Sequence, residues 1–254
     1  FAIHYHNQTL DLSYPHIMGI LNVTPDSFSD GGRYNHVDQG LRHTEQMIKD
    51  GATIIDVGGE STRPNASPVS EQKEIDRVIK VVEAINHNFG KQVWVSVDTS
   101  NPTVMTLASQ VGAKIWNDVR ALTRPDAIAT AAKLDIPVML MHMRGEPTTM
   151  NQLAQYGDVT RDVIDELKIR IDEALAAGVK AENIMIDPGF GFAKNAQQNL
   201  KLLQEFWKLN ELGYPILSAL SRKRFIGEAL GGADAQQRAV GSVAAHLLSI
   251  QQGA

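Results

Sequence analysis

Short apolar segments of strand type recur along the chain, and each ends in a polar residue that could carry chemistry. They occupy residues 16–22, 53–56, 93–98, 114–117, 137–142, 183–187 and 215–221. In an α/β fold the carboxyl ends of parallel strands share one rim, and ligands bind there. The pattern therefore predicts that polar residues spread from Asn22 to Ser221 face a single pocket.

Patterns with helical spacing lie between these segments. Ser70 can cap a helix whose apolar residues recur every three or four positions, and a second helix is expected between Asp158 and Gly178. Strand and helix alternate with no polar linker, which predicts one parallel-sheet domain over residues 1–254. Shorter helices are expected over residues 37–49, 101–111, 125–134, 196–209 and 235–249.

Two α/β architectures compete, an open doubly wound sheet and a (β/α)8 TIM barrel. The glycine fingerprint of a dinucleotide-binding fold is missing after the first segment, where the chain reads Asn22-Val-Thr-Pro-Asp26. The length and the seven regular repeats favour the barrel. Ile3 and Tyr5 alternate with polar residues, so residues 1–15 are expected to form a β-hairpin that closes the bottom of the barrel, with a frayed arm as the alternative.

A barrel requires eight strands, but the seventh helix finishes just before Ala254. Either the protein continues into an eighth strand or the barrel is open on one side. We favour continuation, because an unpaired strand edge beside a ligand site invites association with other chains. The sequence begins with Phe1, so further residues are expected to precede it as well.

Composition excludes several classes of partner. The net charge is −5 with no run of five like charges, so neither nucleic acid nor an anionic membrane is expected to bind. Cysteine is absent, which excludes disulfides and thiolate metal sites and fits a cytoplasmic location. No apolar stretch has the length of a membrane span, and the N-terminus lacks a signal-peptide pattern.

The first candidate segment, residues 22–32, is a strand end followed by a loop with proline and glycine at turn positions. It is either a plain connection or a mobile lid that carries Phe28. Asn22 offers a neutral oxygen to a phosphate or to Mg²⁺. One amide oxygen holds Mg²⁺ weakly, so the ion would take its other ligands from water and substrate phosphates.

The second candidate segment is residues 56–64, in which two glycines follow a strand and allow a ligand to approach the backbone. Thr62 and Arg63 add a hydroxyl and a fixed cation. A turn with a surface arginine is the alternative. No Walker-type lysine follows, so the segment is not a nucleotide P-loop.

Asp98, Asn117 and Asp187 form the third candidate group, each at the end of an apolar segment. A carboxylate can accept paired N–H groups from a planar amidine-like edge, and an asparagine both donates and accepts. Each aspartate could instead cap a following loop or helix. Three such residues at rim positions favour a flat heterocyclic ligand.

The fourth candidate is Ser221-Arg222-Lys223, directly after the seventh segment. The start of a helix with two cations is a plausible anion site, with a solvated basic turn as the alternative. His142 is expected to be a hydrogen-bonded rim residue rather than a metal ligand, because no second His or Cys lies at ligand spacing. Gly189 and Gly191 suggest a loop that places aromatic residues at the mouth of the pocket.

Taken in this order, the segments resemble dihydropteroate synthases, the folate-pathway family that sulfonamides inhibit. The resemblance spans nearly the whole chain, and its first, second and last motifs are specific in combination. The matching stretches are residues 19–32, Asp56-Val-Gly-Gly-Glu-Ser-Thr-Arg-Pro64, Val97-Asp-Thr99, Asn117-Asp118, Met141-His-Met143, Asp187-Pro-Gly-Phe-Gly191 and Ser221-Arg-Lys223.

The resemblance implies a (β/α)8 barrel that joins 6-hydroxymethyl-7,8-dihydropterin diphosphate to 4-aminobenzoate and releases diphosphate. It also implies Mg²⁺ as cofactor, sulfonamides as inhibitors and a homodimer. By position, the residues expected to carry catalysis are Asp98, Asp187, Lys223 and Arg63. The pterin would contact Asp98, Asn117, Val119, Met141, Asp187 and Lys223; the diphosphate Asn22 (through Mg²⁺), Thr62, Arg63 and Arg222; and the aminobenzoate Phe28, Thr62, Pro64, Phe192 and Ser221.

The chain departs from the family in two places. An Arg-x-His motif of the eighth strand is absent because the sequence ends first, and Ala219 stands where the family commonly has glycine. Two other functions remain open. One is a methyltetrahydrofolate–corrinoid methyltransferase, which would give the cationic segments no diphosphate to bind. The other is a non-catalytic pterin-binding paralogue.

Overall fold

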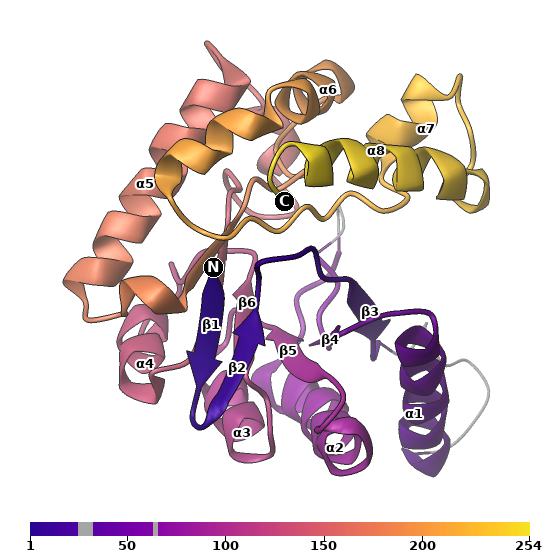
Figure 1. The fold of residues 1–254 in the computed structure, drawn as a ribbon, viewed down its shortest axis with the longest axis vertical. Helices are drawn as coiled ribbons and strands as arrows, with labels where there is room; N and C mark the ends of the chain where they lie inside the picture. The colour runs from indigo at the N-terminus through magenta and orange to yellow at the C-terminus, as the bar shows by residue number, and fades with distance from the viewer. Residues whose placement is uncertain (25–32, 63–65) are drawn as a thin grey trace.

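The computed structural model describes residues 1–24, 33–62 and 66–254. Its main sheet has six parallel strands that follow one another in chain order, so the topology has none of the strand-order reversal of a doubly wound sheet. Figure 1 shows the helices arranged in an arc around this sheet. The strands are β3 (Met18–Asn22), β4 (Ile54–Gly58), β5 (Trp94–Asp98), β6 (Ile115–Asp118), β7 (Val138–Met141) and β8 (Ile184–Asp187).

The seventh expected strand is only partly formed. Residues 215–221 join β8 through one parallel bridge between Ile186 and Ile216. The Ile186 N–H donates to the carbonyl of Pro215 (2.9 Å), and the Leu217 N–H donates to the carbonyl of Ile186 (2.8 Å). In the described part of the chain no strand pairs with the other side of this segment, so the barrel is not closed. The α/β class is confirmed, and the arrangement is that of a TIM barrel that the described residues do not close.

The predicted helices are present, and their caps explain where two of them begin. The Ser70 hydroxyl accepts from the backbone of Lys73, and the Asp158 carboxylate accepts from Thr160 and Arg161. The expected helix at 196–209 breaks into α6 and a 3₁₀ turn, and the expected helix at 235–249 starts later, after a 3₁₀ turn. The helices are α1 (Arg33–Lys49), α2 (Glu71–Phe89), α3 (Pro102–Gln110), α4 (Ala127–Leu134), α5 (Val159–Ala176), α6 (Ala196–Gln204), α7 (Arg224–Ala229), which begins just after the expected helix start at residues 221–223, and α8 (Ala239–Gln251).

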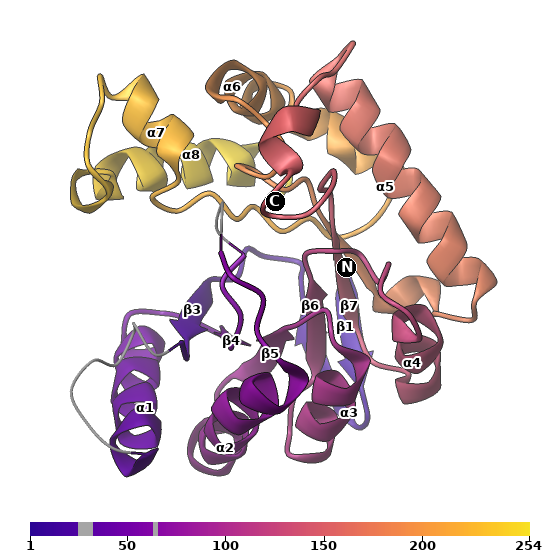
Figure 2. The same cartoon turned by 180° about the vertical axis from the view of Figure 1, so that it is seen from behind.

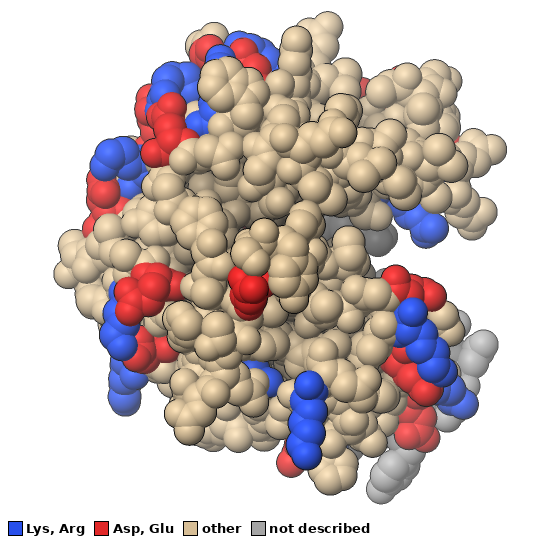
Figure 3. Space-filling model, in the orientation of Figure 1, with Lys and Arg blue, Asp and Glu red and all other residues tan. Residues whose placement is uncertain are grey.

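The core lies between the curved sheet and the helices outside it. Strands β4 and β6 to β8 are buried along their whole length, as expected for parallel strands covered on both faces. Strand β3 differs because it is a sheet edge, and its Ile20 is 51% exposed. Figure 3 shows a notch between the part of the surface that carries α7 and α8 and the part that carries α1, on the side where the barrel is open.

The N-terminal hairpin is confirmed. Strands β1 (Ala2–Tyr5) and β2 (Gln8–Asp11) pair antiparallel, with Ile3 opposite Leu10 and both side chains buried. The hairpin lies in front of the sheet in Figure 1 and behind it in Figure 2, so it covers one end of the strands. This leaves the other end, where the carboxyl ends of the strands lie, available for a ligand.

On the face seen in Figure 3, Lys and Arg side chains are interspersed with Asp and Glu, so neither sign of charge forms a continuous patch there. Within the described ranges, no helix combines the length and the apolar character that crossing a membrane requires.

Candidate active site

The register of the sheet brings three predicted strand ends, Asn22, Asp98 and Asn117, into one row with Gly58 of β4. Asn22 pairs with Gly58, Gly58 with Asp98, and Asp98 with Asn117. Residues in register on adjacent parallel strands lie about 4.8 Å apart. The polar ends of β3, β5 and β6 therefore meet at one rim, as the sequence pattern predicts, with Gly58 of β4 between Asn22 and Asp98.

Asp56 lies one layer below this row and was not among the predicted site residues. Its carboxylate accepts from the Ser96 hydroxyl (2.7 Å) and from the Asn117 amide nitrogen (3.1 Å). Burial raises the pKa of Asp56, its two hydrogen bonds oppose that rise, and the charge of Asp187 adds to it. Asp56 thus fixes the Asn117 amide and leaves the amide oxygen of that residue free for a ligand. The signal in the sequence was its position two residues before Gly58, which puts it on the same face of β4.

Asp98 has a strongly raised pKa and no hydrogen-bond donor among the described residues. Burial raises the pKa of Asp98 well above its ordinary value, and the neighbouring charge of Asp56 raises it further, followed by Asp118. Among the described residues, no group donates a hydrogen bond to the Asp98 carboxyl. Asp98 is only partly exposed to solvent at the end of β5. A partly desolvated carboxyl without a protein donor is suited to a ligand that supplies N–H groups.

Asp187 and Lys223 face the same pocket from the other side. The Asp187 carboxylate accepts from the Gly189 N–H (2.7 Å). Burial raises the pKa of Asp187, while Lys223 opposes the rise. Burial also lowers the pKa of Lys223 to about 8, with Asp187 working against that change. The Lys223 ammonium donates to the carbonyl of Phe190 and lies 4.9 Å from the centre of the Phe192 ring.

The expected apolar contacts are buried at the same rim. Val119 and Met141 are 6% and 4% exposed, and both line a hollow of about 380 Å³ between the loops after β6 and β7 and helix α5. Phe192 is half-buried beneath Lys223. The idea that the glycines place both aromatics at the mouth is wrong for Phe190. That ring is fully buried in the core and stacks at 6.2 Å on Phe206.

The basic segment after residue 220 differs from the expected helix start. Helix α7 has six residues and begins at Arg224, so side chains rather than a helix dipole carry the positive charge. Arg222 has a positive φ of 56°, its N–H donates to the Ser242 hydroxyl (2.8 Å), and its side chain is exposed. Ser221 is exposed beside it.

Three predicted site residues, Phe28, Arg63 and Pro64, lie outside the described residues. Thr62 is half-buried at the boundary of the described part. Asn22 is exposed at the end of β3, and a Cβ added at Gly58 would lie 3.8 Å from its amide oxygen and 3.7 Å from an oxygen of Asp98. Glycine therefore keeps open the space between these two oxygens.

The described residues could hold a Mg²⁺ ion here only together with oxygen ligands from water and substrate. Asn22 supplies one neutral oxygen, and the described residues contain no group of three His, Cys, Asp or Glu that could hold a metal. Water and diphosphate would have to supply most of the six oxygens that Mg²⁺ requires.

His142 is a hydrogen-bonded rim residue, as predicted. Its Nε2 lies 2.7 Å from the Glu166 carboxylate and its Nδ1 lies 2.9 Å from the ammonium of Lys194. Burial lowers the pKa of His142 to about 4, and the charge of Lys194 lowers it further. The ring is therefore neutral near pH 7, and each of its two nitrogens has a hydrogen-bond partner.

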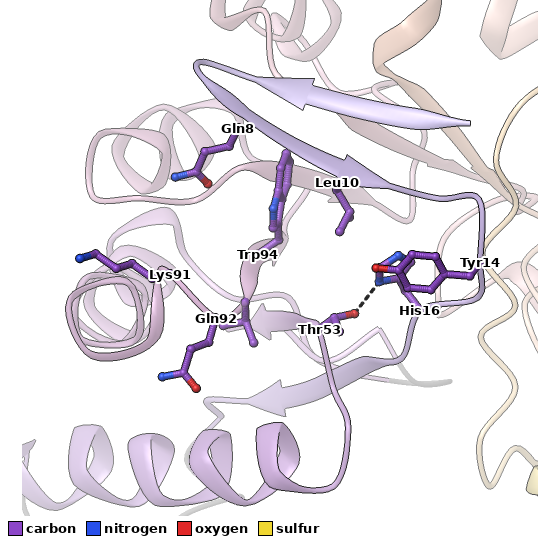
Figure 4. A pocket seen from close by; sticks show the side chains of 10 residues that line it. Gln8, Leu10, Tyr14, His16, Thr53, Lys91, Gln92 and Trp94 are labelled. Carbon is purple, nitrogen blue, oxygen red and sulfur yellow. Dashed lines mark hydrogen bonds between the residues drawn. The ribbon is translucent and has the colours of Figure 1, made fainter.

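A second hollow, of about 400 Å³, lies at the opposite end of the strands beneath the hairpin (Figure 4). Gln8 and Leu10 of the hairpin and Trp94 at the start of β5 line it. The His16 ring bonds the Thr53 hydroxyl (2.8 Å) and the carbonyl of Asp11 (2.6 Å), which connects the hairpin to the barrel. These groups satisfy one another, so this hollow is where the hairpin docks.

Comparisons with known proteins identify the family of this chain. Residues 18–254 match the family described as pterin binding enzyme. The dihydropteroate synthase of Haemophilus influenzae is 50% identical over 252 residues, which is 99% of this chain and 90% of that protein. The dihydropteroate synthase of Escherichia coli is 48% identical over 97% of this chain and 86% of its own length.

Solved structures give the same result. The Yersinia pestis dihydropteroate synthase in a sulfonamide drug complex superposes with a TM-score of 0.93 at 46% identity, covering 100% of this chain and 91% of that one. The Xanthomonas albilineans enzyme in complex with 7,8-dihydropteroate gives 0.87 at 43% identity, with 98% and 88% covered. The chain therefore belongs to the pterin binding enzymes and, among them, to the dihydropteroate synthases, which are transferases. The resemblance inferred from the motifs is confirmed.

The isolation of Asp98 leads to a prediction about stability. Below about pH 4 the carboxyl is protonated in both the folded and the unfolded chain. As the pH rises, the unfolded chain releases the proton while the raised pKa of Asp98 retains it in the folded protein, so this residue destabilises the fold increasingly toward neutral pH. We expect Asp98→Asn to raise the melting temperature at pH 7.5. Each unit by which folding raises the pKa of Asp98 costs about 1.4 kcal/mol of folding free energy, and each kcal/mol regained raises the melting temperature by about 2–4 °C.

Calorimetric melting at pH 4 and pH 7.5 checks this prediction. Asp172→Asn is the matched control, because that side chain is 58% exposed and should give no pH-dependent gain. An unchanged or lower melting temperature for Asp98→Asn at pH 7.5 would show that the carboxyl is compensated in the free protein.

Proposed function

We propose that this protein condenses 6-hydroxymethyl-7,8-dihydropterin diphosphate with 4-aminobenzoate to give 7,8-dihydropteroate and diphosphate. One observation supports this most strongly. Asp98, Asn117 and Asp187 converge beside Lys223 at one rim, in a chain about half of whose residues are identical to dihydropteroate synthases.

The acidic residues suit a pterin. Asp98 and Asp187 would accept N–H groups from its amino-pyrimidinone edge. These donors would stabilise the ionised carboxylates and so lower the raised pKa values of the free protein on binding. The free amide oxygen of Asn117 would accept a further N–H, and Lys223 would donate to ring acceptors from the opposite side. Val119 and Met141 would contact the flat faces of the ring.

The cationic residues suit the diphosphate. Arg222 has a guanidinium without a partner among the described residues, and with Thr62 and Arg63 it would bind the phosphate oxygens. Asn22 would hold Mg²⁺, which when bound neutralises the negative charge of the leaving diphosphate. Arg63 would assist catalysis through the same charge stabilisation.

The aminobenzoate would lie against Phe192 and Ser221, which flank Lys223, together with Phe28, Thr62 and Pro64. The Xanthomonas albilineans relative is known in complex with 4-aminobenzoic acid, and the Yersinia pestis relative with a sulfonamide drug. We infer that sulfonamides would inhibit this protein by competing for the same place.

Positioning and charge stabilisation are sufficient for this chemistry. The bond between the exocyclic CH₂ of the dihydropterin and the diphosphate oxygen breaks first, and the electron-rich ring stabilises the resulting positive charge. The arylamine nitrogen then forms the new bond and releases a proton. This chemistry requires no strong base. His142 is not available as one, because both of its ring nitrogens are hydrogen-bonded within the protein.

A diphosphate-release assay tests the function. With Mg²⁺ and the pterin diphosphate present, release should depend on added 4-aminobenzoate, and Asp187→Asn should weaken pterin binding because it replaces an acceptor with a donor. Binding of the pterin without condensation would favour the non-catalytic paralogue. Methyl transfer from methyltetrahydrofolate to a corrinoid would instead identify the methyltransferase.

The buried ammonium of Lys223 predicts a pH dependence. Its pKa of about 8 means that it is charged below pH 8 and loses a donor above it. We expect the affinity for the dihydropterin to fall above pH 8 by up to about tenfold per pH unit, as one required proton is lost. Calorimetric titrations from pH 7 to pH 9.5 measure it.

Lys223→Met is the control for this titration. The ligand, Asp187 and Lys194 titrate in both proteins, so the difference between the two profiles isolates Lys223. The variant should bind more weakly and with a flatter profile. Identical pH profiles would contradict the assigned role.

We also propose a homodimer that forms through helix α8. Val240, Val243 and Leu247 form an apolar stripe on its outer face and are 82%, 60% and 55% exposed. Exposed apolar stripes of this kind mark interaction surfaces. The cytoplasmic location inferred from the lack of cysteine stays a prediction.

Replacement of the stripe tests the dimer. Light scattering of the purified protein should give about twice the chain mass of 27.8 kDa, and Val243→Glu with Leu247→Glu should halve it without a loss of melting temperature. Leu175→Glu on α5, also an exposed apolar residue, is the control that should stay dimeric. A wild-type monomer, or a double variant that still dimerises, would contradict the proposal.

A further inference from the structure

Lys194 is a buried lysine that the proposed chemistry does not use. It is 7% exposed, and its ammonium lies 2.9 Å from each of three acceptors, the carbonyls of Gly189 and Phe192 and the Nδ1 atom of His142. An ammonium has three N–H donors, so the three acceptors match it completely. Burial lowers the pKa of Lys194 to about 7, and Asp187 opposes that change. Burying this charge costs free energy, so packing alone does not account for a lysine at this position.

Two of the acceptors belong to the loop after β8, which has one internal backbone hydrogen bond, from the Phe192 N–H to the Gly189 carbonyl (3.1 Å). Gly189, Gly191 and Ala193 have positive φ angles of 71°, 80° and 50°. A Cβ added at Gly189 would lie 2.0 Å from the carbonyl of His142, so the loop packs directly on the end of β7. Ala193 adopts a left-handed conformation although it is not glycine, which costs free energy. Hydrogen bonds from outside the loop must compensate for this strain.

The same loop orients two of the residues proposed to hold the pterin. Its Gly189 N–H donates to the Asp187 carboxylate (2.7 Å). Its Phe190 carbonyl accepts from the Lys223 ammonium. The conformation that Lys194 stabilises therefore decides where the Asp187 carboxylate and the Lys223 ammonium point.

We propose that Lys194 is a positioning residue for the pterin: by bonding the carbonyls of Gly189 and Phe192, it fixes the loop that orients Asp187 and Lys223. This inference rests on the proposed function, because it concerns the same site. Lys194 itself does not contact the reacting atoms.

The third bond of Lys194 connects the loop to helix α5. The ammonium donates to His142 Nδ1, so the proton of the neutral ring is on Nε2 and is donated to Glu166 (2.7 Å). The Glu166 carboxylate also accepts from Arg144 (3.0 Å). Glu166 lies within α5, so the chain of contacts anchors the loop to a long helix rather than to another loop.

The variant Lys194→Met keeps the length of the side chain and removes all three donors. We expect the dissociation constant for 6-hydroxymethyl-7,8-dihydropterin diphosphate, measured by calorimetry with Mg²⁺, to rise about ten- to a hundred-fold through the loss of charge-assisted hydrogen bonds. The matched control is Lys201→Met on α6, whose lysine is 43% exposed and pairs with Asp158 at the surface. It should bind like the wild type.

The measurement separates positioning from a general structural role. If Lys194 only stabilises the fold, the variant melts at a lower temperature but binds the pterin with unchanged affinity per folded molecule, as judged by circular dichroism at the titration temperature. That result would overturn the inference. A wild-type protein that does not bind the pterin would instead refute the proposed function.

A measurement on the wild-type protein keeps the inference testable if Lys194→Met does not fold. At pH 6, below the pKa of Lys194 and above that of His142, ¹⁵N NMR should show the His142 ring neutral with its proton on Nε2. The signal is assigned by its loss in His142→Gln. A proton on Nδ1 would show that Lys194 does not donate to the ring, and it would overturn the proposed anchor.

Discussion

The site depends on the burial of acidic groups at the rim, where the described residues do not supply enough positive charge to compensate them. Asp56, Asp98 and Asp187 all have raised pKa values, with burial as the largest cause in each case. Folding alone would favour apolar or amide side chains there, since one unpaired buried carboxyl costs several kcal/mol. In the proposed function, a pterin edge with several N–H donors would remove this cost, and the removal would supply both binding energy and specificity.

The strand ends were predictable because parallel strands obey a simple rule. Asn22, Asp98 and Asn117 each follow an apolar segment, and sequential strand order is enough to place them in one row. Asp56 received no role because the sequence pattern ended its segment there, whereas the strand runs on to Gly58, and because it acts through Asn117, a contact that depends on the register between three strands. Pattern alone also could not show that Phe190 turns into the core while Phe192 stays at the rim.

The partly formed seventh strand has a similar explanation. Residues 215–221 have the composition of a strand, yet only the β8 side offers a partner in the described part of the chain, and Pro215 has no N–H to donate. Periodicity reports which residues suit a sheet, whereas a strand also needs a partner along its length, and residues 215–221 find one only around Ile186. The same reasoning explains the exposed Ile20 on β3, whose apolar character fits a covered position that this edge strand lacks.

Two lysines bond the loop after β8. One of them keeps the loop rigid, and the other remains available to a ligand. Lys194 bonds carbonyls and a neutral histidine, so its charge is fully used inside the protein. Lys223 bonds one carbonyl and faces Asp187, so its remaining donors stay available to a ligand. A loop that contains three left-handed residues would otherwise sample other conformations, and each would misplace Asp187. A reaction that relies on positioning rather than on a strong base is the kind that most needs such an anchor.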